Sequence, residues 1–182
     1  MASTPISNRN FLSPTGFKFT LKRSPKVAFF CNEANIPDLI LGVANQPTYL
    51  KDIPTPGDKI IFGDLNVKFM VDEDLTNYME IQNWIRGLGY PERLEQYAEL
   101  EKQLNYGEKY AQRASNVYSD GTLMVLNSNS VSNFQIVFKD LFPYTLSTLQ
   151  FDATQTDINY FTADVSFKYT VYDIVDLNGN PL

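Results

Sequence analysis

The stretch Phe161-Thr-Ala-Asp-Val-Ser-Phe-Lys-Tyr-Thr-Val171 decides the fold class, because its apolar and polar residues alternate without a break. Apolar side chains occupy the odd positions, while polar or charged side chains, including Asp164 and Lys168, occupy the even ones. Successive side chains of a strand point to opposite faces of a sheet, so this segment predicts one long strand with a buried and a wet face. Such a strand is typical of an antiparallel sheet or of a barrel lining.

The N-terminal part of the chain predicts an arm followed by a hairpin. Residues 1–15 are rich in Ser, Asn and Pro and are expected to have no core of their own. Residues 17–21 alternate Phe or Leu with Lys or Thr, which predicts a strand. Residues 23–26 predict a turn, because Pro25 fixes its φ angle and lacks an N–H donor. Residues 27–32 would then return as the second strand.

A proline-rich loop is predicted between the next strands. Strands are expected over residues 39–46 and, beyond the loop, over residues 59–62 and 65–71. Residues 47–57 hold three prolines and a glycine, and prolines at this density do not fit a central strand. We therefore expect an ordered but irregular loop whose exposed apolar residues predict a docking surface: Tyr49, Leu50 and Ile53.

The hydrophobic period becomes helical after the acidic run at residues 72–74. Six residues at spacings of three and four, mostly apolar, then share one face: Leu75, Tyr78, Met79, Gln82, Ile85 and Leu88. This pattern predicts an amphipathic helix that ends at Gly87 or Gly89, with the acidic run capping its first turn. Trp84 is interpreted as a core residue of this helix, with an anchor between subunits as the alternative. Residues 91–104 predict a second, more polar helix.

The C-terminal half adds further strands and a closing turn. Asp120-Gly121 predicts a turn before a strand over residues 122–126, since Asp-Gly pairs favour hairpin turns. Alternation over residues 134–138 predicts a strand that ends at residues 140–143. Residues 176–180 predict a plain turn, because they lack the repeated ligands and the terminal Glu of a calcium loop.

The composition is that of a globular, acidic protein. Its 182 residues, 43% apolar and 14% aromatic, suffice for one folded domain with its own core. The net charge of −6 and the lack of clustered Lys and Arg exclude nucleic-acid binding by phosphate neutralisation. An acidic surface serves solubility, or it repels DNA and lets it pass. No secretory signal or membrane span is recognisable, so we expect a protein that stays in the cytoplasm unless an assembly carries it elsewhere.

Residue types for catalysis are scarce. The chain has no histidine, which removes the commonest general base and metal ligand, and no phosphate-loop motif occurs. An enzyme would therefore need carboxylates alone, such as Asp72, Asp74 and Asp152. Cys31, the single cysteine, lies in an apolar run and predicts a buried small hydrophobe rather than a reactive thiol. Neither a cofactor nor a metal is expected.

Two local patterns and their order resemble the tail tube protein family of contractile-tailed bacteriophages. The first is Pro56-Gly-Asp-Lys59, then the strand at residues 65–71 and the helix that carries Trp84. The second is Ile136-Val-Phe-Lys-Asp-Leu-Phe-Pro143, followed by a short strand segment, Thr148–Asp152, and by Tyr160–Tyr172. This shared order covers most of residues 16–175.

The resemblance implies a mainly β (α+β) fold, an antiparallel β-sandwich or half-barrel with one or two flanking helices. It implies an arm over residues 1–15 and a single domain over residues 16–182, with a helical insert at about 74–104. It also implies a non-enzymatic virion protein, assembled in the host cytoplasm, whose hexameric rings stack into a conduit for DNA. Sheath and baseplate proteins would be partners, without a membrane. The candidate subunit or ring contacts are Tyr49, Leu50, Ile53, Pro54, Phe142 and Pro143.

Other functions remain open at the level of sequence. The N-terminal arm and the polar second helix leave room for a tube initiator, a tube terminator or a baseplate-associated relative. A carbohydrate-binding β-sandwich would use the exposed aromatic residues as stacking platforms. An enzyme based on carboxylates would lose activity when Asp72, Asp74 and Asp152 are replaced, whereas a tube protein would not.

Overall fold

The structure is a computed structural model that describes residues 12, 14, 16–89, 117–127, 129–152, 154 and 160–182. The predicted helix over residues 91–104 and nearly all of the predicted arm lie outside the described residues. The elements are β1 (Phe17–Leu21), α1 (Pro25–Phe29), β2 (Cys31–Ala34), β3 (Leu39–Gln46), β4 (Ile53–Phe62), β5 (Leu65–Met70), α2 (Thr76–Gly89), β6 (Ser119–Leu126), β7 (Ser132–Leu146), β8 (Thr162–Lys168) and β9 (Val171–Val175). Among them, no helix is both long and apolar enough to cross a membrane.

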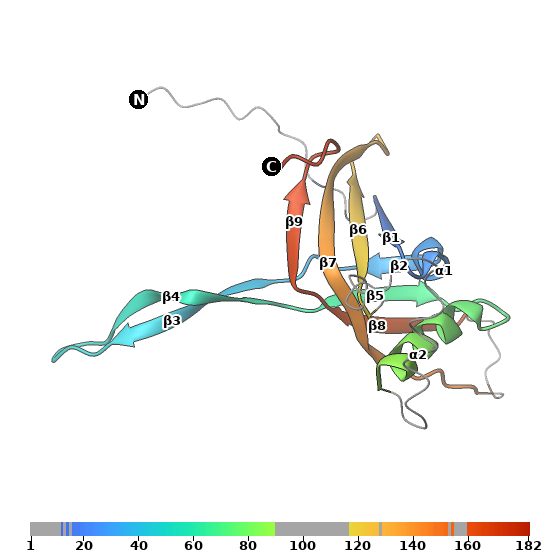
Figure 1. Cartoon of the computed structure of the whole chain (residues 1–182), viewed down its shortest axis with the longest axis horizontal. Coiled ribbons are helices and arrows are strands. Elements are labelled where there is room, and N and C mark those ends of the chain that lie inside the picture. Colours follow the sequence, from blue (N-terminus) through green and yellow to red (C-terminus); the bar gives the residue numbers. More distant parts are fainter. Residues whose placement is uncertain are drawn as a thin grey trace, which may run out of the picture.

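Two antiparallel sheets form the body of the protein and share one long strand (Figure 1). The first sheet has the order β1-β6-β7-β9, and the second has the order β2-β5-β8-β7. β7, with 15 residues, pairs with β6 and β9 along its first part and with β8 along its last part. The mainly β class is therefore confirmed, with β7 passing from one sheet into the other.

The core lies between the inward faces of the two sheets, where the predicted alternation of side chains is realised. In β8 the fully buried residues Ala163, Val165 and Phe167 alternate with polar residues on the outer face. β5 supplies Leu65, Val67 and Phe69 opposite them in register. The other large buried side chains belong to β1, α1, α2, β6 and β7: Phe19, Leu21, Val27, Ile81, Trp84, Leu123, Ile136, Phe138 and Leu141.

The predicted N-terminal hairpin is wrong. Residues 25–29 form the short helix α1, and β2 pairs with β5 of the second sheet rather than with β1. Pro25 is the reason, because it stands at the start of α1, where a missing N–H costs nothing and a fixed φ favours the helix. A proline that suggested a turn therefore marks a helix start.

The predicted long C-terminal strand is two strands. β8 ends at Lys168 and β9 begins at Val171, after which the chain joins the first sheet. β7, conversely, does not end at residues 140–143 but continues through Asp140, whose φ of 56° bends the strand. Alternation in the sequence indicates which face of a sheet a side chain occupies, but it does not indicate where the chain passes from one sheet to the other.

Asp120-Gly121 is not a turn either, because both residues lie within β6 at a shift of its register with β7. A Cβ atom on Gly121 would stand 2.5 Å from Leu141 Cδ1, so the glycine permits close packing there. The predicted turn at residues 176–180 is confirmed: the Asp176 carboxylate accepts hydrogen bonds from the Asn178 and Asn180 N–H groups.

The predicted amphipathic helix is α2, and the strand-to-helix junction is capped as expected. The Asp72 carboxylate accepts a hydrogen bond from the Thr76 N–H at 2.6 Å. Buried Asn77 braces the same junction, donating from Nδ2 to the Met70 carbonyl at 2.8 Å. Trp84 is 1% exposed and packs beside Phe167, so it is a core residue of the subunit.

Candidate functional site: an apolar ribbon and its base

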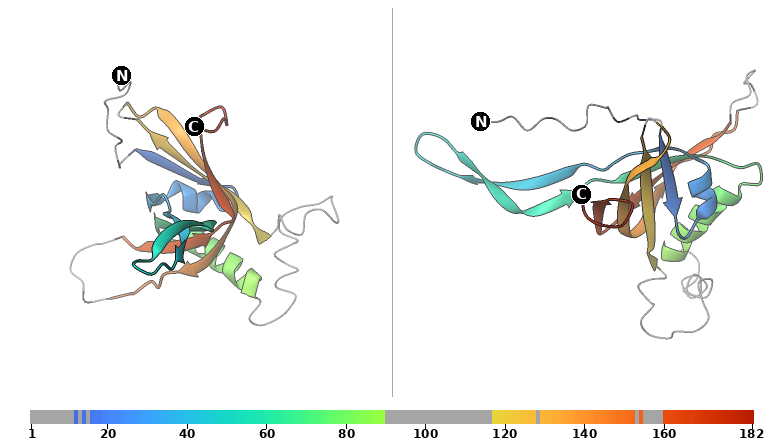
Figure 2. Two further views of the ribbon diagram at one scale, coloured as in Figure 1. Left: turned by 90° about the vertical axis from the view of Figure 1, so that its left-hand side faces the viewer. Right: turned by 90° about the horizontal axis from the view of Figure 1, so that it is seen from above.

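β3 and β4 form a two-stranded ribbon that leaves the two sheets on the side opposite α2 (Figures 1 and 2). The prediction of an irregular loop is wrong for residues 53–57, which belong to β4. Both strands of the ribbon are edge strands, and proline is tolerated there; Pro54 and Pro56 pair with Asn45 and Val43. Gly57 is required by close approach, since a Cβ atom on it would lie 2.7 Å from the Gly42 carbonyl oxygen.

Both faces of the ribbon are apolar and exposed. Leu41 lies opposite Ile60 and the adjacent residue Ile40 lies opposite Ile61, so these two pairs occupy opposite faces. The four side chains are 47 to 60% exposed. A two-stranded ribbon is marginal in water by itself, and an apolar surface on both faces marks a contact with another chain. The ribbon is therefore the candidate functional site.

The six candidate contact residues do not form one surface. Tyr49, Leu50, Ile53 and Pro54 are exposed residues of the ribbon and its tip. Phe142 and Pro143 lie on β7: the Phe142 ring packs against Tyr118 with centroids 5.8 Å apart, and Pro143 is buried. Their role in contacts between subunits stays a prediction.

Sequence reasoning missed the apolar residues along the ribbon's length. Leu39, Ile40 and Leu41 are consecutive, so they lack the alternation of a strand with one wet face. An unbroken apolar run is typical of a strand that is covered on both faces. Ile40 and Leu41 are exposed on both faces of the ribbon in this subunit, so the unbroken apolar run indicates that another chain covers them.

The aromatic side chains Phe62, Tyr169 and Tyr172 fix the ribbon to the sheets. The Phe62 ring meets both tyrosine rings edge-on, with centroids 6.0 and 5.6 Å apart. The Tyr169 hydroxyl donates to the Gly63 carbonyl at 2.9 Å, and burial raises the pKa of Tyr169 to about 12. This hydroxyl therefore stays protonated and keeps its role as a donor.

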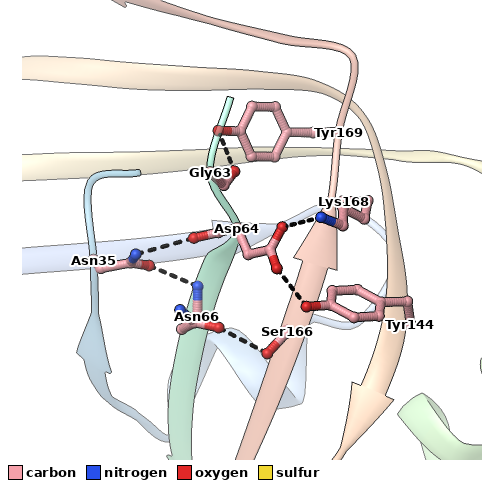
Figure 3. A network of polar contacts seen from close by, with 8 residues as sticks. All are labelled: Asn35, Gly63, Asp64, Asn66, Tyr144, Ser166, Lys168 and Tyr169. Carbon is pink, nitrogen blue, oxygen red and sulfur yellow. Dashed lines mark hydrogen bonds and ion pairs between the residues drawn. The ribbon is translucent and has the colours of Figure 1, made fainter. Parts of the chain in front are cut away.

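A polar network braces the same base from the outer face of the second sheet (Figure 3). The Asp64 carboxylate accepts hydrogen bonds from Lys168 Nζ and from the Tyr144 hydroxyl. Asn35 donates to the Asp64 carbonyl at 3.0 Å and accepts from the Asn66 N–H at 2.6 Å. Asp64 lies two residues after the end of β4. It thus joins four parts of the chain at the ribbon base: β7, β8, the start of β5 and the segment before β3.

We expect the Asp64 brace to depend on pH in a defined direction. Lys168 and then Tyr144, by hydrogen bonding to the carboxylate, hold the pKa of Asp64 below its usual value, and Asp64 raises the pKa of Lys168. The stabilisation is therefore present above about pH 4 and is lost as the pH falls through the lowered pKa. It is also lost at alkaline pH, above the raised pKa of Lys168.

An NMR titration of the Asp64 carboxyl carbon checks this expectation. In Lys168→Met the pKa of Asp64 should rise toward its usual value. The difference in unfolding free energy between the unsubstituted protein and Lys168→Met should also shrink as the pH falls below about 4. Lys139→Met, which removes a comparable exposed ion pair with Asp173, is the control. If the pKa of Asp64 were the same in the unsubstituted protein and in Lys168→Met, Lys168 would not be a partner of Asp64 in solution.

The residues considered for catalysis are not assembled into a site. Asp72 caps α2, whereas Asp152 lies in the segment after β7 and accepts hydrogen bonds from Thr154. Within the described ranges, no group of three acidic or cysteine residues is placed to hold a metal ion. Burial raises the pKa of the half-buried Cys31 thiol to about 11, which opposes a nucleophilic role.

A two-sheet fold that extends an exposed apolar ribbon, without an assembled catalytic or metal site among the described residues, is the architecture of a structural assembly subunit. The comparison with family models gives the particular family: the model of the phage tail tube protein matches residues 3–175. The chain belongs to the phage tail tube protein family. It is a structural tail tube protein and not an enzyme, and the family places it in the virion tail. No curated protein sequence matches the chain.

Solved structures share this fold at low sequence identity. A chain of the sheath–tube complex of an extracellular contractile injection system, PVC, aligns with a TM-score of 0.61 and 13% identity, over 97% of this chain and 99% of that one. A chain from the tube-terminating cap of the anti-feeding prophage aligns with a TM-score of 0.57 and 12% identity, over 95% and 96%. A chain from the baseplate of the anti-feeding prophage gives 0.53 and 12%, over 97% and 99%.

Proposed function

We propose that the protein forms hexameric rings that stack into the tail tube and conduct DNA during ejection. The observation that carries the proposal is the ribbon, because Ile40, Leu41, Ile60 and Ile61 stay exposed in the isolated subunit. Stacked rings supply neighbours on both sides of a projecting ribbon. Membership of the tail tube family supports the tube, and the sixfold ring is the part that requires a test.

Open sheet edges support a ring closed by strand pairing. β1 and β9 are the two outer strands of the first sheet, and no other strand of the described residues pairs with their outer edges, so a neighbouring copy can pair there. The C-terminal residues shield part of the β9 edge, through a bridge between Val175 and Pro181. In a ring, each edge that is a liability for a monomer gains a partner.

The outer faces of the sheets suit a conduit that does not bind DNA. On the second sheet Lys68 and Lys168 are balanced by Asp164 and Asp64, and on the first sheet Lys139 is balanced by Asp173. Each of these pairs is neutral and adds no excess positive charge to hold phosphates, so either face, lining the lumen, would let DNA pass. Sheath and baseplate proteins are the expected partners outside the tube, and assembly would take place in the host cytoplasm.

A tube initiator or terminator is the second candidate. Chains from a sheath–tube complex, a terminating cap and a baseplate align with similar TM-scores, so the fold is compatible with each position along a tail. Self-assembly separates the candidates, because a main tube subunit polymerises whereas a terminator stops at one ring.

Negative-stain electron microscopy of the purified protein across a concentration series tests the proposal. We expect hollow rings at low concentration and stacked tubes at high concentration, with sixfold symmetry in end-on views. Rings that never stack would favour the initiator or terminator. Small particles that stay monomeric at every concentration and salt would contradict self-assembly, and a glycan panel would then test the carbohydrate-binding sandwich.

A further inference from the structure

A second exposed apolar surface lies far from the ribbon. It consists of Phe151, Tyr160 and Phe161, which we name the aromatic platform, and these side chains are 72, 76 and 37% exposed. The rings of Phe151 and Phe161 pack together with centroids 4.8 Å apart, so they present one continuous surface. Clustered exposed aromatic residues mark a contact with another molecule.

The aromatic platform lies at the opposite end of the second sheet from the ribbon base. β5 runs from the base, where Leu65 pairs with Phe167, to Met70, which pairs with Thr162. The Val71 N–H then donates to the Phe161 carbonyl at 2.9 Å. Six residues of β5 separate the two ends, a distance of about 20 Å, with the ribbon projecting in the other direction (Figure 1).

The ribbon tip has the shape and chemistry of an anchor. Tyr49 and Leu50 are 101 and 92% exposed, and the turn that carries them is closed by hydrogen bonds between Thr48 and Lys51. Lys51 and Asp52, which follow Leu50, have opposite charges, so the tip presents its two apolar side chains without a net charge. The tip and the platform therefore match in apolar character.

Resting on the proposed function, we propose that the ribbon tip of one copy docks on the aromatic platform of a second copy. An open-ended tube requires head-to-tail contacts, in which two different surfaces at opposite ends of a subunit meet. The tip and the platform satisfy this geometry. A tip-to-tip contact would instead close a symmetric dimer, which cannot continue into a tube.

Cross-linking between two single-cysteine proteins tests the docking. In a Cys31→Ala background, Leu50→Cys is mixed with Phe151→Cys before assembly and treated with a short bis-maleimide. The matched control is Leu50→Cys mixed with Val131→Cys, because Val131 is 58% exposed and lies in the β6–β7 turn, outside the platform. We expect cross-linked dimers in the first mixture and none above background in the control or in either single variant alone.

A substitution gives an independent readout. Phe151→Ser removes an exposed ring and should leave the melting temperature unchanged. It should raise the concentration needed for tube formation about thirtyfold, the effect of losing one interface hot spot. An unchanged concentration would overturn the docking.

The outcomes separate this inference from the proposed function. Tubes without a link between positions 50 and 151, or a link of Leu50→Cys to itself, overturn the docking and leave the tube intact. The 50–151 link without tubes supports the docking and counts against the stacked tube. If the unsubstituted protein forms no tubes and the pair does not link, both are overturned.

Discussion

Replacing Ile40 by Lys together with Ile61 by Glu is expected to abolish tube formation while leaving the subunit folded. The two residues are direct cross-strand partners in the ribbon and are 52 and 60% exposed. Opposite charges in that position attract each other, so the pairing of β3 with β4 is retained. One face of the ribbon, however, changes from apolar to charged. Burying that pair against a neighbour would cost several kcal/mol, more than most interfaces tolerate.

Sedimentation velocity and electron microscopy measure the effect on assembly, and circular dichroism measures the fold. The melting temperature of dilute protein should stay within a few degrees of the unsubstituted value, since exposed substitutions usually change stability by less than about 0.5 kcal/mol. The matched control is Val131→Lys with Met79→Glu, two exposed apolar residues outside the ribbon and away from the sheet edges. Normal tubes from the ribbon variant would remove the ribbon from the interface. Failure of the control to assemble would show that added charge alone is the cause.

The sequence predicted most of the elements whose side chains divide cleanly between two faces. Ala163, Val165 and Phe167 report a buried face, and the helical spacing around Trp84 reports α2. The points at which the chain passes from one sheet to the other could not be predicted from the sequence. Tyr169 continues the alternation of β8, yet it turns the chain toward the first sheet and holds the ribbon base. Such corners depend on packing between distant segments, which a local pattern does not contain.

The sequence predicted the exposed tip of the ribbon, but it did not predict the apolar residues along the ribbon's length. Tyr49 and Leu50 are predicted as contact residues because they lie in a proline-rich segment. The same prolines led to the prediction of an irregular loop where the structure has β4. The base of the ribbon could not be predicted for another reason: Asp64, Tyr144 and Lys168 lie at least 24 positions apart in the sequence. Their hydrogen bonds exist because β7 and β8 bring them together.

Replacing Trp84 by Ala is expected to have the largest effect on the stability of the subunit. The side chain is 1% exposed, and its Nε1 donates a hydrogen bond to the Val117 carbonyl at 3.1 Å. Its ring lies beside Phe167, and the Arg23 guanidinium stands 4.7 Å from its centroid. Removing a buried indole costs about 3–5 kcal/mol, a large part of the 5–15 kcal/mol that holds a domain together. The melting temperature should fall by roughly 10 °C or more.

Thermal unfolding of dilute, unassembled protein separates this role from that of an anchor between subunits. Trp84→Phe keeps an aromatic ring but leaves the Val117 carbonyl without its donor, so its cost should be intermediate, at about 1–3 kcal/mol. Leu177→Ala, at an exposed apolar residue, is the control and should be neutral. If Trp84→Ala melted normally in dilute solution and failed only in tube assembly, Trp84 would act between subunits. Since the whole ring is enclosed by its own chain, we expect the opposite: destabilised monomers, with assembly lost because the monomer unfolds.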